Sequence, residues 1–148
     1  MSLTLLLAIA TAASSVPTSL IRIEAVPSTA SVHYRQSFEV TVSIRNASSE
    51  AQVLQLDGCQ LAWQWKADNP DVQILRPAEC RKNPLQYVRV ASGETHQVRI
   101  SASISASDTS QASATVTFRL GCQPHLGYDI ATLAPYIWSN AISVTGVK

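Results

Sequence analysis

The feature that most constrains this chain is a repeated alternation of apolar and polar residues with a period of two. It is clearest in residues 36–46, where Phe38, Val40, Val42 and Ile44 are separated by polar side chains. Successive side chains of a β-strand point to opposite faces, so the pattern predicts a strand with one buried face. Similar runs predict further strands at residues 20–26, 52–56, 61–66, 72–75, 85–90, 96–105, 113–120 and 137–144.

This set of short strands determines the expected fold class. A polar face on each strand is typical of antiparallel sheets with one solvated side, so we expect an all-β domain. The architecture that fits is a single antiparallel β-sandwich, Ig-like, with about seven to nine strands, over residues 16–148. The Ser-rich stretch 101–113 keeps its alternation on both sides of residues 108–111, and we interpret it as a hairpin.

The first residues have the pattern of an export signal. Leu3 to Ala13 is an apolar run, shorter than the roughly 20 residues that cross a bilayer. Ala8-Ile-Ala10 and Ala10-Thr-Ala12 both match the small-x-small pattern of signal cleavage sites. We predict that residues 1–15 are a signal peptide, with a buried or frayed N-terminal helix as the alternative. The protein is then exported, periplasmic or secreted, and has no membrane span.

Composition excludes several classes of function. The formal net charge is +1 and charged residues make up 14% of the chain, so a nucleic-acid partner is not expected. Glycine occurs 5 times, too rarely for a glycine-rich phosphate loop. The chain has no Gly-x-Ser-x-Gly elbow, and His33, His96 and His125 lie in no local catalytic pattern. We therefore expect no enzyme activity and no cofactor.

The three cysteines fit an exported protein with one disulfide and one spare thiol. Cys59 and Cys80 both follow turn-like segments and are close in sequence, so we predict that they are paired. A loop of about twenty residues closed in this way would gain roughly 3 kcal/mol in the chain-entropy model. Pairings that use Cys122 remain open at this point.

Cys122 also belongs to the one fragment that resembles a metal site. A thiolate at Cys122 and an imidazole at His125 are ligands that copper or zinc accepts. A closed site needs three or four ligands, so we predict no metal site and keep a copper or zinc carrier as an alternative function.

Two aromatic features have both a structural and a functional interpretation. Trp63 and Trp65 share one face of a predicted strand, and their polar neighbours favour burial in the core over an exposed binding platform. Residues 121–135 form the longest segment without strand character, and such loops are often functional. We predict a protein-binding surface there, formed by Leu126, Tyr128 and Tyr136, with capping of the sandwich as the alternative. Separately, Asn46-Ala47-Ser48 matches the N-glycosylation pattern.

Several segments resemble the bacterial Ig-like proteinase-inhibitor family called BsuPI. They are Phe38-Glu-Val-Thr-Val-Ser-Ile-Arg-Asn46, Asp57-Gly-Cys-Gln-Leu-Ala-Trp63-Gln-Trp65, and the Ser92-Gly93-Glu94 turn. The resemblance covers residues 36 to about 105 and implies an Ig-like fold and proteinase inhibition. It transfers no inhibitory residue to this chain.

The sequence therefore predicts a non-enzymatic, exported, monomeric module that binds a protein partner. Proteinase inhibition is the activity that the family resemblance implies. The metal carrier and a structural envelope domain without a small ligand are the alternatives.

Overall fold

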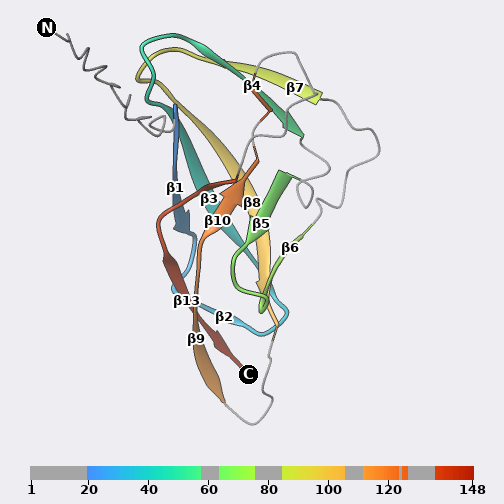
Figure 1. Cartoon of the computed structure of the whole chain (residues 1–148). Helices are drawn as coiled ribbons and strands as arrows, with labels where there is room; N and C mark the ends of the chain where they lie inside the picture. The colour runs from blue at the N-terminus through green and yellow to red at the C-terminus, as the bar shows by residue number, and fades with distance from the viewer. Residues whose placement is uncertain (1–19, 58–63, 76–84, 106–111, 124, 127–135) are drawn as a thin grey trace, which may run out of the picture.

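The computed structural model describes residues 20–57, 64–75, 85–105, 112–123, 125–126 and 136–148. These residues form thirteen β-strands (Figure 1). In chain order they are β1 (Ile21–Pro27), β2 (Ser31–His33), β3 (Ser37–Asn46), β4 (Gln52–Asp57), β5 (Trp65–Ala67), β6 (Val72–Ile74), β7 (Leu85–Val90), β8 (Thr95–Ile104), β9 (Ser113–Phe118), β10 (Leu120–Cys122), β11 (His125–Leu126), β12 (Ile137–Trp138) and β13 (Ile142–Val147).

The first sheet has four antiparallel strands in the order β1-β3-β8-β6. This is the A-B-E-D order of an immunoglobulin sandwich. Its longest ladder joins β3 to β8 from Ser37↔Ser103 to Arg45↔Thr95.

The second layer consists of three sheets of three strands each. The consecutive strands β9, β10 and β11 belong one to each of these sheets and connect them along the chain. β9 pairs with β13, β10 pairs with β5 and β12, and β11 pairs with β4. β4 pairs in turn with β7, and β13 pairs with β2 in parallel. All other described pairings are antiparallel, so the chain folds as an Ig-like antiparallel β-sandwich, as the alternation predicted.

The core lies between these two layers. The predicted inward residues of β3, from Phe38 to Ile44, are each at most 5% exposed. Phe38 meets Phe118 of β9 edge-to-face, with ring centroids 6.5 Å apart, which joins the layers. Trp65 is 2% exposed, so its predicted burial is confirmed. The strand alternation therefore identified the core face correctly.

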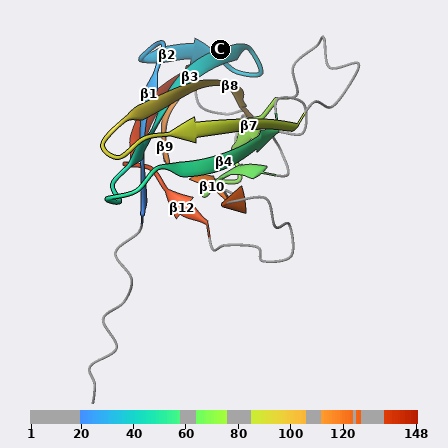
Figure 2. The same ribbon diagram turned by 90° about the horizontal axis from the view of Figure 1, so that it is seen from above.

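The pair β3–β8 continues into the pair β4–β7, and together they change layer. β3 and β8 belong to the first sheet, whereas β4 is hydrogen-bonded to β11 of the second layer. Between the two ladders, residues 46–51 lie opposite residues 91–94. The segment that joins β3 to β4 is therefore longer than the segment that joins β7 to β8. Extra residues on one strand bend it, as in a β-bulge. β4 and β7 consequently cross one end of the sandwich (Figures 1 and 2).

The side chain of Asn46 holds this bend. It is fully buried, and its Nδ2 donates to the carbonyl oxygens of Glu50 and Val90 at 2.7 and 3.0 Å. Its Oδ1 accepts hydrogen bonds from the backbone N–H and the hydroxyl of Ser48. The amide nitrogen that glycosylation would modify is therefore engaged inside the fold.

The opposite turn is the predicted one at Ser92-Gly93-Glu94. The N–H of Glu94 donates to the carbonyl of Ala91, and Gly93 has a φ of 76°. A positive φ at the third turn position is strained for residues with a Cβ, which explains the glycine. The N–H of Gly93 then donates to the Asn46 carbonyl, which ties the two bends together.

The structure corrects four predictions. The strand number exceeds the predicted seven to nine, because bends split two of the predicted runs and because the short strands β2 and β11 lie outside all of them. The predicted 137–144 strand, for example, is interrupted after Trp138, where Asn140 hydrogen-bonds to both backbone groups of Ala25 in β1. The stretch 101–113 is no hairpin, because β8 and β9 pair with strands of different layers. An alternating pattern specifies strands but not their partners.

The third correction concerns segment 121–135, which was expected to have no strand character. Cys122 ends β10, and His125 and Leu126 form β11. Short strands with two or three residues are below the length at which alternation can be recognised. The fourth correction concerns Gln64, one of the polar neighbours of Trp63 and Trp65 that the alternation places on the outer face. It is 5% exposed, because it precedes β5 and does not follow the alternation of that strand.

Several predictions concern residues that lie outside the described ones. These are the signal peptide at 1–15, Trp63, the Cys59–Cys80 disulfide and Tyr128. They remain predictions.

We predict that Asn46→Ala lowers the free energy of unfolding by about 3 kcal/mol, because it removes the hydrogen bonds of the Asn46 side chain to the buried Val90 carbonyl and to the Ser48 N–H. Urea denaturation at neutral pH measures this. Gln97→Ala, which removes an exposed amide from the same sheet, is the control and should change stability by less than about 0.5 kcal/mol. Similar effects for the two variants would contradict the role assigned to Asn46.

Candidate functional site

The best-organised polar and aromatic surface lies on the sheet β12-β10-β5. In this sheet Gly121 of β10 is paired with Trp138 of β12 on one side and with Lys66 of β5 on the other. Residues that are directly paired point to the same face of a sheet. Cys122, the next residue of β10, is 1% exposed and faces the core, so the row Lys66, Gly121 and Trp138 lies on the outer face.

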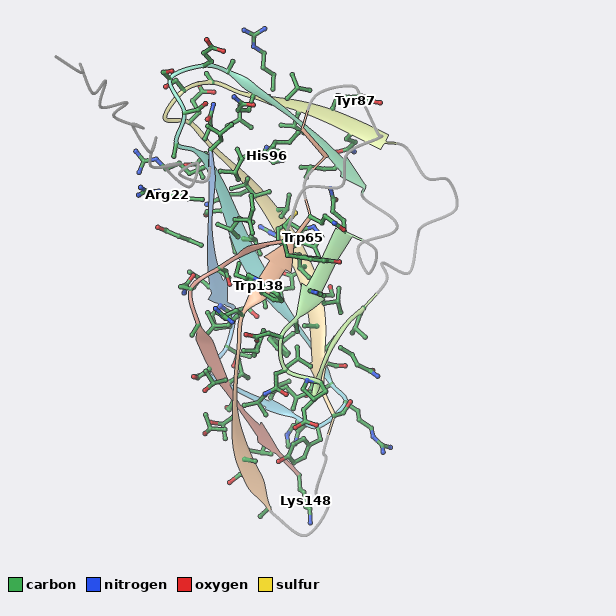
Figure 3. All side chains as sticks on the ribbon, viewed as in Figure 1. Arg22, Trp65, Tyr87, His96, Trp138 and Lys148 are labelled. Atoms are coloured by element: carbon green, nitrogen blue, oxygen red, sulfur yellow. The ribbon has the colours of Figure 1, made fainter. Side chains whose placement is uncertain are left out.

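The indole of Trp138 lies directly over Gly121. A Cβ at position 121 would come within 2.8 Å of Cε3 and Cζ3 of this ring, so only glycine leaves room for it. Tyr136 stacks on Trp138 with ring centroids 5.9 Å apart and an interplanar angle of 30°. The absence of a side chain at Gly121 therefore lets the Trp138 ring lie close against the sheet, with Tyr136 stacked on it. Figure 3 shows the Trp138 label next to the strand that Figure 1 labels β10.

Two cations surround the aromatic pair. The Nζ of Lys66 lies 3.8 Å from the centroid of the Tyr136 ring and 5.3 Å from that of Trp138. The guanidinium carbon of Arg119 lies 5.4 Å from the Trp138 ring centroid. All three distances are within the range of cation–π attraction. We call Lys66, Arg119, Tyr136 and Trp138 the aromatic–cationic cluster.

Asp68 fixes the position of Arg119. The Nε of Arg119 donates to Asp68 Oδ2 at 2.8 Å, and its backbone N–H donates to Oδ1 at 2.7 Å. The backbone N–H of Asp68 donates to the Arg119 carbonyl in return. Burial alone would raise the pKa of Asp68, but the hydrogen bonds and the charge of Arg119 outweigh it and lower this pKa below its ordinary value. Arg119 is thereby held beside the Trp138 ring.

The aromatic–cationic cluster combines the residue types that are typical of surfaces that contact other proteins. Tyr, Trp and Arg are the residues that most often contribute strongly to protein interfaces. Their positions here are set by Gly121 and Asp68, so little side-chain freedom is lost on binding.

Of the predicted binding residues, the structure places one in the cluster. Tyr136 is half-buried and stacked on Trp138. Leu126 pairs through its backbone with Leu54 of β4, and Tyr128 lies outside the described residues. The sequence interpretation missed Lys66, Arg119 and Trp138. A glycine inside a strand signals close approach of another group, and Gly121 was the available signal.

The predicted metal alternative receives no support from Cys122. Its thiol is free and buried, and burial raises the pKa of this thiol. A protonated thiol is a poor ligand, because metals bind the thiolate. In the part of the chain that the structure describes, no three His, Cys, Asp or Glu side chains are grouped to hold a metal ion. The same residues include no helix long and apolar enough to span a membrane.

Comparisons with known proteins identify neighbours among solved structures only. No protein-family model and no curated protein matches the chain. The FixG-related protein from Vibrio parahaemolyticus is similar at 12% identity, over 88% of this chain and 98% of its own, with a TM-score of 0.42. The ASH/PapD-like domain of human CEP192 (PapD-like domain 7) is similar at 9% identity, over 99% of this chain and 95% of its own, with a TM-score of 0.32. Neither is a BsuPI-type inhibitor.

We predict that Gly121→Ala destabilises the protein by about 1–2 kcal/mol, because the added methyl group displaces the Trp138 ring. Urea denaturation of the wild type, Gly121→Ala, Trp138→Ala and the double variant measures this as a double-mutant cycle. In the Trp138→Ala background the same glycine substitution should have little effect. Equal losses in both backgrounds would show that the ring is not what constrains position 121.

We also predict a specific acid sensitivity. The pKa of Asp68 is lower in the folded than in the unfolded protein, so its contribution is present above the unfolded value and is lost as pH falls through the folded value. Unfolding measured below about pH 4 should therefore show less acid destabilisation in Asp68→Asn than in the wild type. Arg119→Gln should reduce the acid destabilisation as well. Parallel pH profiles for all three proteins would contradict this.

Proposed function

We propose that this protein is an exported, non-enzymatic module that binds a protein partner through the aromatic–cationic cluster. The observation that carries the proposal is the fixed arrangement of Lys66, Arg119, Tyr136 and Trp138 on the outer face of one sheet. The export part rests on the apolar Leu3–Ala13 run alone.

The physical support is the position of large side chains at the surface. Tyr136 and Trp138 are half-buried, so part of each side chain is covered by the protein and part is exposed to solvent. A partner that covers the exposed part removes apolar area from water without first having to order these rings. The two cations favour a partner surface with carboxylates at the edge of the contact.

Proteinases are the first partner class to test, because the resemblance over residues 36–105 implies inhibition. The cluster lies mainly outside that range, since only Lys66 falls within it. We therefore expect contact residues that the resemblance does not supply. The metal-carrier alternative has no observation in its favour, and a purely structural role is an outcome of the test below.

The test measures partner binding and folding on the same variants. The purified protein is assayed against serine, cysteine and metallo-proteinases, and immobilised protein is used to capture partners from the envelope extract of its source. Tyr136→Ala should weaken the affinity for a captured partner by at least about 1 kcal/mol, because it removes an anchoring aromatic ring. Thermal unfolding of each variant corrects for its folded fraction.

Tyr87→Ala is the matched control, because Tyr87 of β7 is a 47% exposed tyrosine that lies outside the cluster. Its affinity should equal that of the wild type. If Tyr136→Ala lowers stability but leaves the affinity per folded molecule unchanged, the cluster is structural and the proposal is wrong. Inhibition of one proteinase that is lost in Tyr136→Ala would identify the partner class.

A further inference from the structure

Two arginines lie directly opposite each other where β1 begins and β3 ends. Arg22 is paired with Arg45 in the antiparallel ladder, and both side chains are exposed on the outer face of the first sheet. Directly paired residues have their Cβ atoms about 5 Å apart. Two positive charges are thus held next to each other by the backbone register.

Such a pair destabilises a sheet unless something compensates it. No carboxylate among the described residues forms an ion pair with Arg22 or Arg45. The nearest acidic residue on β1, Glu24, is paired with Ser43 in the adjacent row. Glu94, in the facing turn, accepts a hydrogen bond from the backbone N–H of Ala91 through its Oε2. The protein itself therefore supplies no salt bridge to either arginine within its described part.

The two arginines line a surface pocket of about 280 Å³. Its other lining residues are small or polar: Asn46, Ala47, Ser48, Ser92 and Gly93. None of the lining residues is acidic. Figure 3 shows the side chain of Arg22 pointing away from the sandwich.

The wall of this pocket is built from the bend at Asn46. The N–H of Ala47 donates to the Leu20 carbonyl, and the Ser92 hydroxyl donates to the Ser48 carbonyl. Together with the four hydrogen bonds of the Asn46 side chain, these contacts fix the wall before any ligand binds. The serine hydroxyls and the Asn46 amide already donate within the protein, so among the lining side chains the arginines are the donors that remain for a ligand.

We propose that this pocket binds a doubly charged oxyanion, the phosphate or sulfate group of a ligand, between Arg22 and Arg45. Each guanidinium presents a planar fork of N–H donors that matches two oxygens of such a group. One dianion neutralises both charges and removes their repulsion. The pocket shares no residue with the aromatic–cationic cluster, so this inference stands or falls independently of the proposed function.

The test uses the full chain and two probes, inorganic phosphate and inorganic sulfate, titrated separately at constant ionic strength held with chloride. Isothermal titration calorimetry should show saturable binding at one site. Arg22→Gln and Arg45→Gln should each weaken it at least about tenfold, since each removes charge-assisted hydrogen bonds. Tighter binding of phosphate than of sulfate indicates a phosphate group in the natural ligand, and the reverse order indicates a sulfate group.

Arg99→Gln is the matched control. Arg99 is an exposed arginine on β8 of the same sheet, opposite Thr41, and its substitution should leave anion binding unchanged. Thermal unfolding without anion provides a second readout, in which Arg22→Gln and Arg45→Gln should melt at the wild-type temperature or above it. Non-saturable effects equal to those of chloride, or equal losses in Arg99→Gln, would overturn the proposal. So would full binding in both pocket variants.

Discussion

The buried amide of Asn46 is the interaction on which the arrangement of this sandwich depends. It satisfies backbone groups of both strands where β3 passes into β4, at the point where the ladder with β8 gives way to the ladder with β7. Buried backbone groups without partners are costly, so a bend at this depth needs a side chain with both donors and acceptors. Asparagine meets that need within a single residue.

The bend has consequences on both sides of the molecule. It carries β4 to β11 and thereby closes one end of the sandwich over the core residues Leu54 and Leu56. It also forms one wall of the pocket that holds Arg22 and Arg45. A local hydrogen-bond network thus determines both a packing arrangement and a concentration of positive charge.

The aromatic–cationic cluster depends on a different constraint, the missing side chain at Gly121. Trp138 covers the sheet at this position, and Lys66 of β5 and Arg119, the residue before β10, lie beside the rings. Tyr136 could be proposed from the sequence because it is a large aromatic residue next to a long connection. Lys66 and Arg119 could not, because they are 53 positions apart in the chain (119 minus 66) and meet only through the pairing of β5 with β10.

The sequence by itself determined the all-β class, the Ig-like sandwich and the inward faces of β3, β8, β9 and β13, because the two-residue period of a strand is a local property of the chain. Only the tertiary structure decided which strands pair, that β8 and β9 lie in different layers, and that Asn46 is a buried bend residue instead of an exposed sugar acceptor. Strand pairing depends on contacts between residues distant in the chain, and alternation carries no information on the partner. The cluster and the arginine pair are products of that pairing, and they follow from register rather than from any local motif.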